Sequence, residues 1–358
     1  MNNHIIGIIG AGMIGSHHIE NFQKTNKARI KWLADINQEA LKNLAAKHQI
    51  SNTTIDYKDI LNDPEVESIV ICTPPKFHKN IFIDSVKSGK HVLVEKPAAM
   101  NLPEIDEMIT VAESHPEIKI CDCSARHSRL TPRFKMVKKI IDEGKLGDIY
   151  FIHHNSIWRN NRPGIEYHPA AKWFLNSQIA GGGPLFDWGV YDLSFHLGVL
   201  NDVPDLEKVN TVMLTSGLDA FDPGNDTYDV EEHFVVNMQL GNGVRLYWER
   251  GNHANIEIPN ETRIYGTRGG IRLGYCSWDK PELEFFDLEN DGKGPGRKTQ
   301  IPIDMEGHND ELALANHWID VLENKEKPAM PLELARKHLN IIFECYKKGK
   351  TIQTLQNK

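Results

Sequence analysis

The chain has 358 residues, which is long for one compact domain and sufficient for two, each with its own hydrophobic core. Apolar residues make up 40 % of the chain and charged residues 25 %, a composition typical of a soluble globular protein. The net charge of −8 at pH 7, without a basic stripe, argues against a nucleic-acid partner, and no stretch approaches the ~20 apolar residues of a membrane span.

Strands and helices are expected to alternate through the first third of the chain. Short apolar runs that end at turn residues indicate buried strands, and the longer segments between them have a helical spacing of apolar residues. Such alternation predicts a parallel sheet with right-handed helical crossovers. The expected strands are 5–9, 28–34, 67–72, 91–94 and 118–121, and the expected helices are 14–22, 38–48, 77–88 and 102–114.

The first expected strand ends in Gly10-Ala11-Gly12-Met13-Ile14-Gly15, which opens the first helix. The pattern G-x-G-x-x-G between a strand and a helix is the fingerprint of dinucleotide binding. Gly10 would permit the tight turn, Gly12 would let the backbone approach a pyrophosphate, and Gly15 would let helix and strand pack closely. The helix start would offer free amides and partial positive charge to the phosphates.

Asp35 ends the second expected strand, twenty residues after Gly15. A carboxylate at this place accepts hydrogen bonds from the adenosine ribose hydroxyls and repels the 2′-phosphate of NADP. Ile36 and Asn37, which follow, supply no arginine to hold that phosphate. The sequence therefore predicts NAD as the cofactor, in preference to NADP.

The segment Glu95-Lys96-Pro97 follows the fourth expected strand at its carboxyl end. Open parallel sheets bind ligands at that edge. We therefore expect Lys96 to reach the nicotinamide pocket, whereas a purely solvated role would suit Lys90 better.

After residue 122 the pattern changes to helices followed by many strands. Helices are expected at 131–143, 185–200, 309–324 and 332–348, and strands at 149–157, 208–216, 230–240, 244–250, 262–266, 270–273 and 283–287. Glycine turns between several strands indicate a large, mostly antiparallel, open-faced sheet with helices on one face. The fold class is thus α/β, with a dinucleotide-binding Rossmann domain at 1–122 and an α+β substrate-binding domain at 123–358.

Five cysteines, an odd number without paired spacing, argue against a disulfide framework and favour a reducing compartment. Cys121 and Cys123 have no second cysteine pair, so no metal site is expected. The amino terminus has no basic region, and Gly10 interrupts its apolar run too early for a secretion signal. We expect a cytoplasmic protein without a membrane partner.

Several motifs together resemble the glucose–fructose oxidoreductase, inositol dehydrogenase and rhizopine-catabolism (Gfo/Idh/MocA) family. They are Gly10–Gly15, Cys72-Thr73-Pro74-Pro75, His78, Gly89–Pro97 and Gly181–Gly189. The resemblance implies a Rossmann domain, an open-faced sheet domain and hydride chemistry on sugar or cyclitol carbons. By the same resemblance, the sheet face is expected to be the assembly surface of a homo-oligomer (dimer or tetramer). The resemblance also implies that Thr73, Pro74, His78, Glu95 and Lys96 line the cofactor, together with Gly10, Gly12, Met13, Ile14, Gly15 and Asp35.

Members of that family commonly carry Asp-x-x-x-His on the helix after the glycine run. Here the stretch is Asp187-Trp188-Gly189-Val190-Tyr191, so tyrosine stands at the histidine position. Glucose–fructose oxidoreductase and dimeric dihydrodiol dehydrogenase are similar in using tyrosine. Asp187 and Tyr191 are expected one turn apart on the same helix face. His196 is about half a turn out of phase and is expected to have a partner elsewhere.

The predicted catalytic residues are Lys96, Asp187 and Tyr191. Tyr191 would donate and accept the hydroxyl proton, since Lys96 and oxidised nicotinamide would lower its pKa from ~10. Lys96 would polarise the substrate oxygen, and Asp187 would bind substrate or fix Lys96. Alternatively Lys96 is the base and Tyr191 only binds.

The substrate pocket is expected to draw on residues that suit a sugar ring, a carboxylate or many hydroxyls. The candidates are Arg126, Trp158, Arg159, Arg162 and His168, although surface salt bridges explain arginines in such loops equally well.

The predicted function is transfer of a hydride between NAD and a secondary alcohol or ketone of a sugar, sugar derivative or cyclitol. Two alternatives stay open. One is cleavage or elimination of a glycoside by transient oxidation with tightly bound NAD, and the other is a non-catalytic regulator that senses NAD or a sugar.

Overall fold

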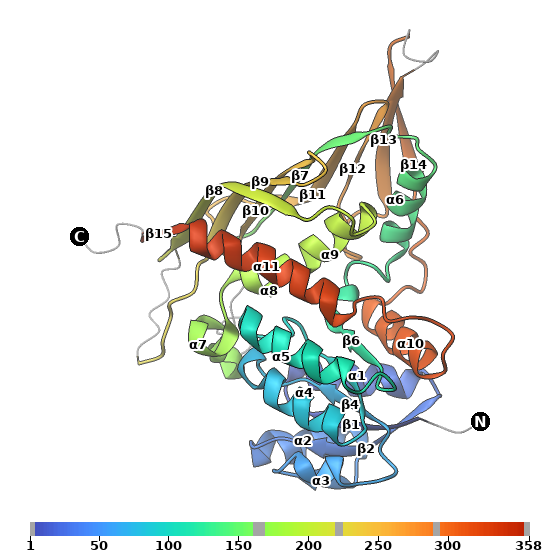
Figure 1. Cartoon of the computed structure of the whole chain (residues 1–358), viewed down its shortest axis with the longest axis vertical. Coiled ribbons are helices and arrows are strands. Elements are labelled where there is room, and N and C mark those ends of the chain that lie inside the picture. The colour runs from blue at the N-terminus through green and yellow to red at the C-terminus, as the bar shows by residue number, and fades with distance from the viewer. Residues whose placement is uncertain (1–3, 160–168, 219–224, 289–293, 354–358) are drawn as a thin grey trace. The chain divides into compact units, whose positions relative to one another are not determined.

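The computed structural model describes residues 4–159, 169–218, 225–288 and 294–353 (Figure 1). The chain forms two compact units, one from residues 1–126 and 308–336, the other from residues 127–307 and 337–358. This division differs from the boundary expected at residue 122. The segment 308–336 belongs to the first unit because helix α10 (Asp310–Leu322) packs on α1 (Met13–Lys24), and Trp318 donates a hydrogen bond of 3.0 Å to Ser68 Oγ.

The first unit contains a six-stranded parallel sheet of order β3-β2-β1-β4-β5-β6, which confirms the expected Rossmann fold. Its central strands are apolar and buried on both faces, as helix-covered parallel strands must be. The strand order reverses between β1 and β4, which puts a ligand crevice at their carboxyl ends. The strands are β1 (His4–Ile9), β2 (Ala28–Ala34), β3 (Asn52–Thr54), β4 (Ser68–Ile71), β5 (His91–Val94) and β6 (Ile120–Asp122).

Helices α2 (Gln38–His48) and α5 (Leu102–Glu113) of this unit begin at asparagine caps. Asn37 accepts a hydrogen bond from Ala40 N, and Asn101 accepts one from Glu104 N, which satisfies an otherwise unpaired amide at each helix start. The remaining helices are α3 (Lys58–Leu61) and α4 (His78–Lys87).

The second unit contains a nine-stranded sheet of order β14-β13-β12-β11-β7-β10-β9-β8-β15. Neighbours run antiparallel except β7 with β10 and β8 with β15, so the expected large, mostly antiparallel sheet is confirmed. Buried and half-buried residues alternate along β9, as in a sheet with one covered face. The strands are β7 (Ile149–Ile157), β8 (Leu206–Ser216), β9 (His233–Leu240), β10 (Arg245–Gly251), β11 (Ile258–Gly266), β12 (Gly269–Leu273), β13 (Glu282–Leu288), β14 (Gly296–Pro302) and β15 (Lys350–Gln353).

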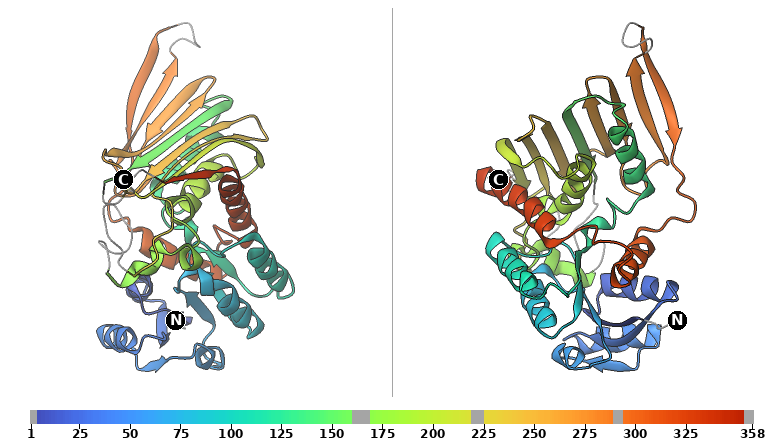
Figure 2. Two further views of the ribbon diagram at one scale, coloured as in Figure 1. Left: turned by 90° about the vertical axis from the view of Figure 1, so that its left-hand side faces the viewer. Right: turned by 45° about the vertical axis from the view of Figure 1, so that its right-hand side comes forward.

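Figure 2 shows helices α6, α9 and α11 on one face of this sheet. The single helix expected at 185–200 is divided into α8 (Pro184–Asp187) and α9 (Gly189–Val199), which meet at Trp188. The others are α6 (Pro132–Asp142), α7 (Ser177–Ala180) and α11 (Leu332–Lys348), the last of which continues from the first unit into the second. Within the described ranges, no helix combines the length and apolar character that crossing a membrane requires.

Candidate active site

Each of the three glycines of the loop after β1 has its own steric environment. Gly10 has φ +114°, and a Cβ there would lie 2.7 Å from the carbonyl carbon of Cys72. A Cβ on Gly15 would lie 2.1 Å from the carbonyl oxygen of Gly10, so helix and strand approach too closely for a side chain. Gly12 differs, because a Cβ there would meet nothing within 4 Å. The protein itself therefore does not require glycine at position 12, and the open space leaves room for a ligand to approach the backbone.

The amino terminus of α1 follows this open space. Its N-cap residue, Gly12, makes no side-chain capping bond, and the first turn contains no acidic residue. The first amides of the helix thus retain hydrogen-bonding capacity and partial positive charge. Together with the open face of Gly12, this arrangement fits a pyrophosphate.

Asp35, directly after β2, is fixed against the same loop. Its carboxylate accepts hydrogen bonds from Ala11 N (2.6 Å) and from Asn37 N (2.7 Å). The next side chain, Ile36, is 86 % exposed. A negative charge is thus held at the rim of the glycine loop.

The loop after β4 carries Thr73, whose Oγ1 is buried and has no partner within the described residues. A buried hydroxyl without a partner is costly unless a ligand or water satisfies it. His78 is fully buried behind this loop, with Nε2 2.7 Å from Thr73 O and Nδ1 3.0 Å from Pro97 O. Burial lowers the pKa of His78, and a neutral ring donates only one of these two bonds at a time.

His78 therefore joins the loops after β4 and β5 from behind. The half-buried Pro74 lies between Thr73 and the 3-10 turn Pro75–Phe77 that leads into α4. Direct contact of Thr73, Pro74 and His78 with a cofactor stays a prediction.

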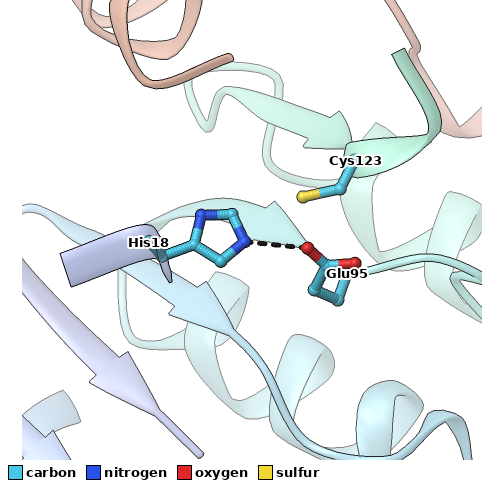
Figure 3. A group of neighbouring side chains, drawn as sticks. All are labelled: His18, Glu95 and Cys123. Atoms are coloured by element: carbon cyan, nitrogen blue, oxygen red, sulfur yellow. Dashed lines mark hydrogen bonds and ion pairs between the residues drawn. The ribbon is translucent and has the colours of Figure 1, made fainter. Parts of the chain in front are cut away.

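Glu95 is the centre of a buried polar cluster at the end of β5 (Figure 3). Its Oε1 lies 2.8 Å from His18 Nε2 and 2.6 Å from Arg126 Nη1, while Oε2 accepts a 3.1 Å bond from Lys96 N. Burial alone would raise the pKa of Glu95, but the Arg126 charge and the hydrogen bond with His18 hold it well below its ordinary value. The ionised carboxylate thus ties the backbone of Lys96 to the helix of the glycine motif.

The same cluster brings ligand atoms of His18, Glu95 and Cys123 within 4.8 Å of one another (Figure 3). The Arg126 guanidinium already balances the Glu95 charge, and a buried positive charge beside this carboxylate would repel a cation. The geometry therefore describes an ion-pair network.

Arg126 was expected to bind substrate, and the structure places it on Glu95, 4 % exposed. Its first role is thus to position the Lys96 segment. Lys96 itself is half-buried in the loop after β5.

In the second unit, Asp187 ends α8 and Tyr191 lies in the first turn of α9. The two residues were expected on one continuous helix, and Trp188 instead joins two short helices, with Tyr191 N bonded to Trp188 O (2.9 Å). Both side chains are buried, at 8 % and 1 % exposure. The Tyr191 ring packs against His127 (centroids 4.9 Å apart) and Trp188 (5.2 Å).

Asp192, beside Tyr191, is fully buried. It accepts bonds from Arg250 Nε (2.8 Å), Arg250 Nη2 (2.7 Å), Trp248 Nε1 (2.8 Å) and the Tyr275 hydroxyl. Burial would raise its pKa, but Arg250 holds it well below its ordinary value. The Arg250 guanidinium also lies 4.7 Å from the centroid of the Trp188 ring, a cation–π contact. The start of α9 is thereby fixed to the sheet.

His196 behaves as the sequence indicates. It is buried, and its Nε2 lies 3.1 Å from Thr262 Oγ1. Burial lowers its pKa to about 3, so the ring is neutral.

The other predicted substrate residues are partly described. Trp158 is half-buried after β7, where its Nε1 donates to Ser156 Oγ (3.0 Å), and Arg159 is exposed. Arg162 and His168 lie outside the described residues.

Sequence reasoning missed several residues that contact or anchor the candidate residues, namely His18 at Glu95, His127 at Tyr191, and the pair of Asp192 and Arg250 at the start of α9. One local signal was present, since Asp192 is a carboxylate inside an otherwise largely apolar helix that is buried along its whole length. Its partners are too distant in the chain to be inferred.

Comparison with known proteins identifies one oxidoreductase family for both parts of the chain. A model of the Gfo/Idh/MocA oxidoreductase family, with an NAD-binding Rossmann fold, matches residues 5–121, and a model of the Gfo/Idh/MocA C-terminal domain matches residues 134–272. Myo-inositol 2-dehydrogenase of Thermotoga maritima is 29 % identical over 266 residues, which cover 74 % of each chain.

Two solved structures share the fold. Levoglucosan dehydrogenase, in complex with NADH and levoglucosan, has a TM-score of 0.81 at 20 % identity and covers 97 % of each chain. A 3-ketoreductase from Actinomadura kijaniata, in complex with NADP and TDP-benzene, has a TM-score of 0.76 at 16 % identity, over 98 % of this chain and 99 % of that chain. One neighbour thus binds NADH and the other NADP.

Proposed function

The chain belongs to the Gfo/Idh/MocA family of NAD-binding oxidoreductases, and from this premise we propose that it transfers a hydride between NAD and a secondary alcohol or ketone of a sugar, sugar derivative or cyclitol. The observation that carries the proposal is the glycine loop of the first unit. Its open face at Gly12, the uncapped start of α1 and the unpartnered Thr73 hydroxyl all fit a dinucleotide. The similarity to inositol and levoglucosan dehydrogenases supports the substrate class.

Different residues would bind different parts of the cofactor. Gly10–Gly15 and the start of α1 would hold the pyrophosphate, and Asp35 would hold the adenosine ribose. Thr73 and Pro74 would line the inner part of the crevice, and His78 and Glu95 would keep its loops in place. Bound nicotinamide dinucleotide supplies the hydride acceptor or donor.

The protein has to move a hydroxyl proton and stabilise a negatively charged oxygen. We assign the proton to Tyr191 and the electrostatic role to Lys96, whose backbone the Glu95 carboxylate fixes. Asp187 would hydrogen-bond substrate or orient Lys96. In the alternative assignment Lys96 takes the proton and Tyr191 binds the substrate oxygen.

Arg126, Trp158, Arg159, Arg162 and His168 stay candidates for substrate binding. Arg126 is the least suited of them to direct contact with substrate, since it is buried and bonded to Glu95. The five cysteines are buried and form no disulfide bond. We propose that the protein is cytoplasmic and forms a homo-oligomer.

The decisive experiment is a spectrophotometric screen of sugars, cyclitols and their keto forms with NAD and NADP. Reduction of the cofactor by a sugar or cyclitol would support the proposal. Product without net NADH would indicate glycoside cleavage by transient oxidation, and sugar binding without any product would indicate a regulator.

A further inference from the structure

The loop between β12 and β13 is held from inside the protein by a buried arginine. Arg133 of α6 is fully buried, and its Nη1 donates to Gly274 O (2.9 Å) and to Lys280 O (2.7 Å). Its Nη2 donates to Asp279 O. Burial of a guanidinium is costly unless its donors are paired. Here three carbonyls of one loop supply partners, so the loop conformation is fixed at both ends.

Further contacts make the same loop rigid. Asp279 Oδ2 accepts bonds from Cys276 N (2.9 Å) and Asn260 Nδ2 (3.0 Å), and a Cβ on Gly274 would lie 2.5 Å from Asp279 Cγ. The Tyr275 ring stacks on Phe195 of α9 at 4.8 Å. The loop is thus attached to the helix that carries Tyr191.

This fixed loop presents Trp278 to the surface, 56 % exposed. The indole lies 5.3 Å from the His127 ring and 5.8 Å from the Trp188 ring, both edge-on, and those two rings pack on Tyr191. Exposure rises from Tyr191, which is buried, through His127 and Trp188, which are half-buried, to Trp278. An aromatic wall therefore leads from solvent to the predicted proton-transfer residue.

We propose that Trp278 stacks on the C–H face of a cyclic sugar or cyclitol and makes the enzyme selective for rings over open-chain polyols. A pyranose or cyclitol ring presents several C–H groups on one face, and an indole ring offers a flat apolar surface to match them. An acyclic polyol has no fixed face, so it gains little. Because Arg133 already orders the loop in the folded protein, substrate binding does not have to order it, and the indole surface is in place when substrate arrives. The inference rests on the proposed function.

The test compares Trp278→Ala and Trp278→Phe with the parent enzyme, using levoglucosan, myo-inositol and methyl β-D-glucopyranoside as cyclic substrates and D-glucitol as the acyclic one. For whichever cyclic compounds the parent oxidises, Trp278→Ala should raise KM about tenfold while kcat changes less than about twofold. Trp278→Phe should raise KM for the cyclic compounds by an intermediate amount, and KM for D-glucitol should change little in either variant. Tyr150→Ala is the matched control, since Tyr150 is 53 % exposed but makes its ring contact with Tyr265 on the sheet.

An unchanged KM for every cyclic substrate in Trp278→Ala would overturn the inference. If the parent oxidises none of them, the wider screen with keto forms still decides the proposed function, and calorimetric titration with the same three cyclic compounds decides the role of Trp278. Binding that weakens in Trp278→Ala but not in Tyr150→Ala would support the stacking surface. Absence of binding to the parent would overturn the inference.

Discussion

At the scale of single residues, we predict that Asp35 determines the preference for NAD over NADP. Its carboxylate is held by Ala11 N and Asn37 N, so the negative charge stays at the rim where a 2′-phosphate would lie. We expect calorimetry to show NADP binding at least about tenfold more weakly than NAD. Asp35→Asn keeps an oxygen acceptor for Ala11 N but removes the negative charge, so it should reduce the difference in affinity between NAD and NADP. Equal affinities for the two cofactors in the parent enzyme would contradict this role.

The second prediction at this scale concerns the hydroxyl group of Tyr191, to which we assign proton transfer. Its ring is buried against His127 and Trp188, so Tyr191→Phe preserves the packing and removes only the hydroxyl. Turnover should fall about a hundredfold or more with NAD affinity unchanged. Tyr191→His should recover part of the activity and move the pH–rate profile toward the histidine pKa of ~6.5.

The comparison variant is Lys96→Met, which should also lose turnover while retaining cofactor binding. Full turnover and an unshifted pH profile in Tyr191→Phe would assign the tyrosine to packing. The proton role would then pass to Lys96.

At the scale of elements, the start of α9 depends on the buried pair of Asp192 and Arg250. Asp192→Asn removes the charge that compensates Arg250, and loss of one partner of a buried pair costs about 3–5 kcal/mol. Chemical unfolding at pH 7 should report this loss. The double variant Asp192→Leu with Arg250→Met is the control, and it should be more stable than Asp192→Asn because no buried charge is left alone.

The pH dependence of this pair has a defined sign. The folded-state pKa of Asp192 lies well below the ordinary 3.8, so the carboxylate stabilises the fold fully above about pH 4 and loses that effect as pH falls through the folded value. His154 lies 3.2 Å from Asp192, and its pKa is lowered by burial below the ordinary 6.5, so its ring is neutral above about pH 7. The difference between parent and Asp192→Asn should therefore be constant from pH 7 to 8. A difference that grew with pH across this range would assign it to another group.

Comparison of the predicted with the observed elements shows which features can be predicted from local sequence patterns. The glycine loop, Asp35 and Glu95–Pro97 were predictable because each motif is local and follows an apolar strand. Strand β3 was missed because its three residues, Asn52–Thr54, form no apolar run. Strand β14 was missed for the same reason, since it contains no apolar run and six of its seven residues are exposed.

Long-range pairing explains the rest of the site. Arg250 lies 58 residues from Asp192 in the chain, and Arg133 lies 141 residues from Gly274. Neither partner is marked by spacing or periodicity, so only the folded chain brings them together. The division of the helix at Trp188 also escapes a pattern-based prediction, because the residues on both sides have a helical spacing.

At the scale of the whole molecule, the chain leaves the first unit after residue 126 and returns to it at residue 308. The first unit is therefore completed by a segment that begins more than 180 residues after residue 126. No sequence motif predicts this return of the chain. Trp318 in that segment is fully buried and bonded to Ser68 at the start of β4, and Met330 O accepts a bond from Asp122 N (2.9 Å). The segment thus contributes core and backbone pairing to the Rossmann sheet.

This arrangement predicts which unit responds when a buried tryptophan is truncated. Trp318→Ala should destabilise the first unit by about 3–5 kcal/mol, the usual cost for a core tryptophan, and should speed amide exchange in β1 and β4 while leaving β9 and β10 protected. Trp248→Ala is the matched control, since Trp248 is equally buried in β10, and it should give the opposite pattern. If residues 308–336 instead belonged with the substrate-binding domain, Trp318→Ala would speed exchange in β9 and β10 and leave β1 and β4 unchanged.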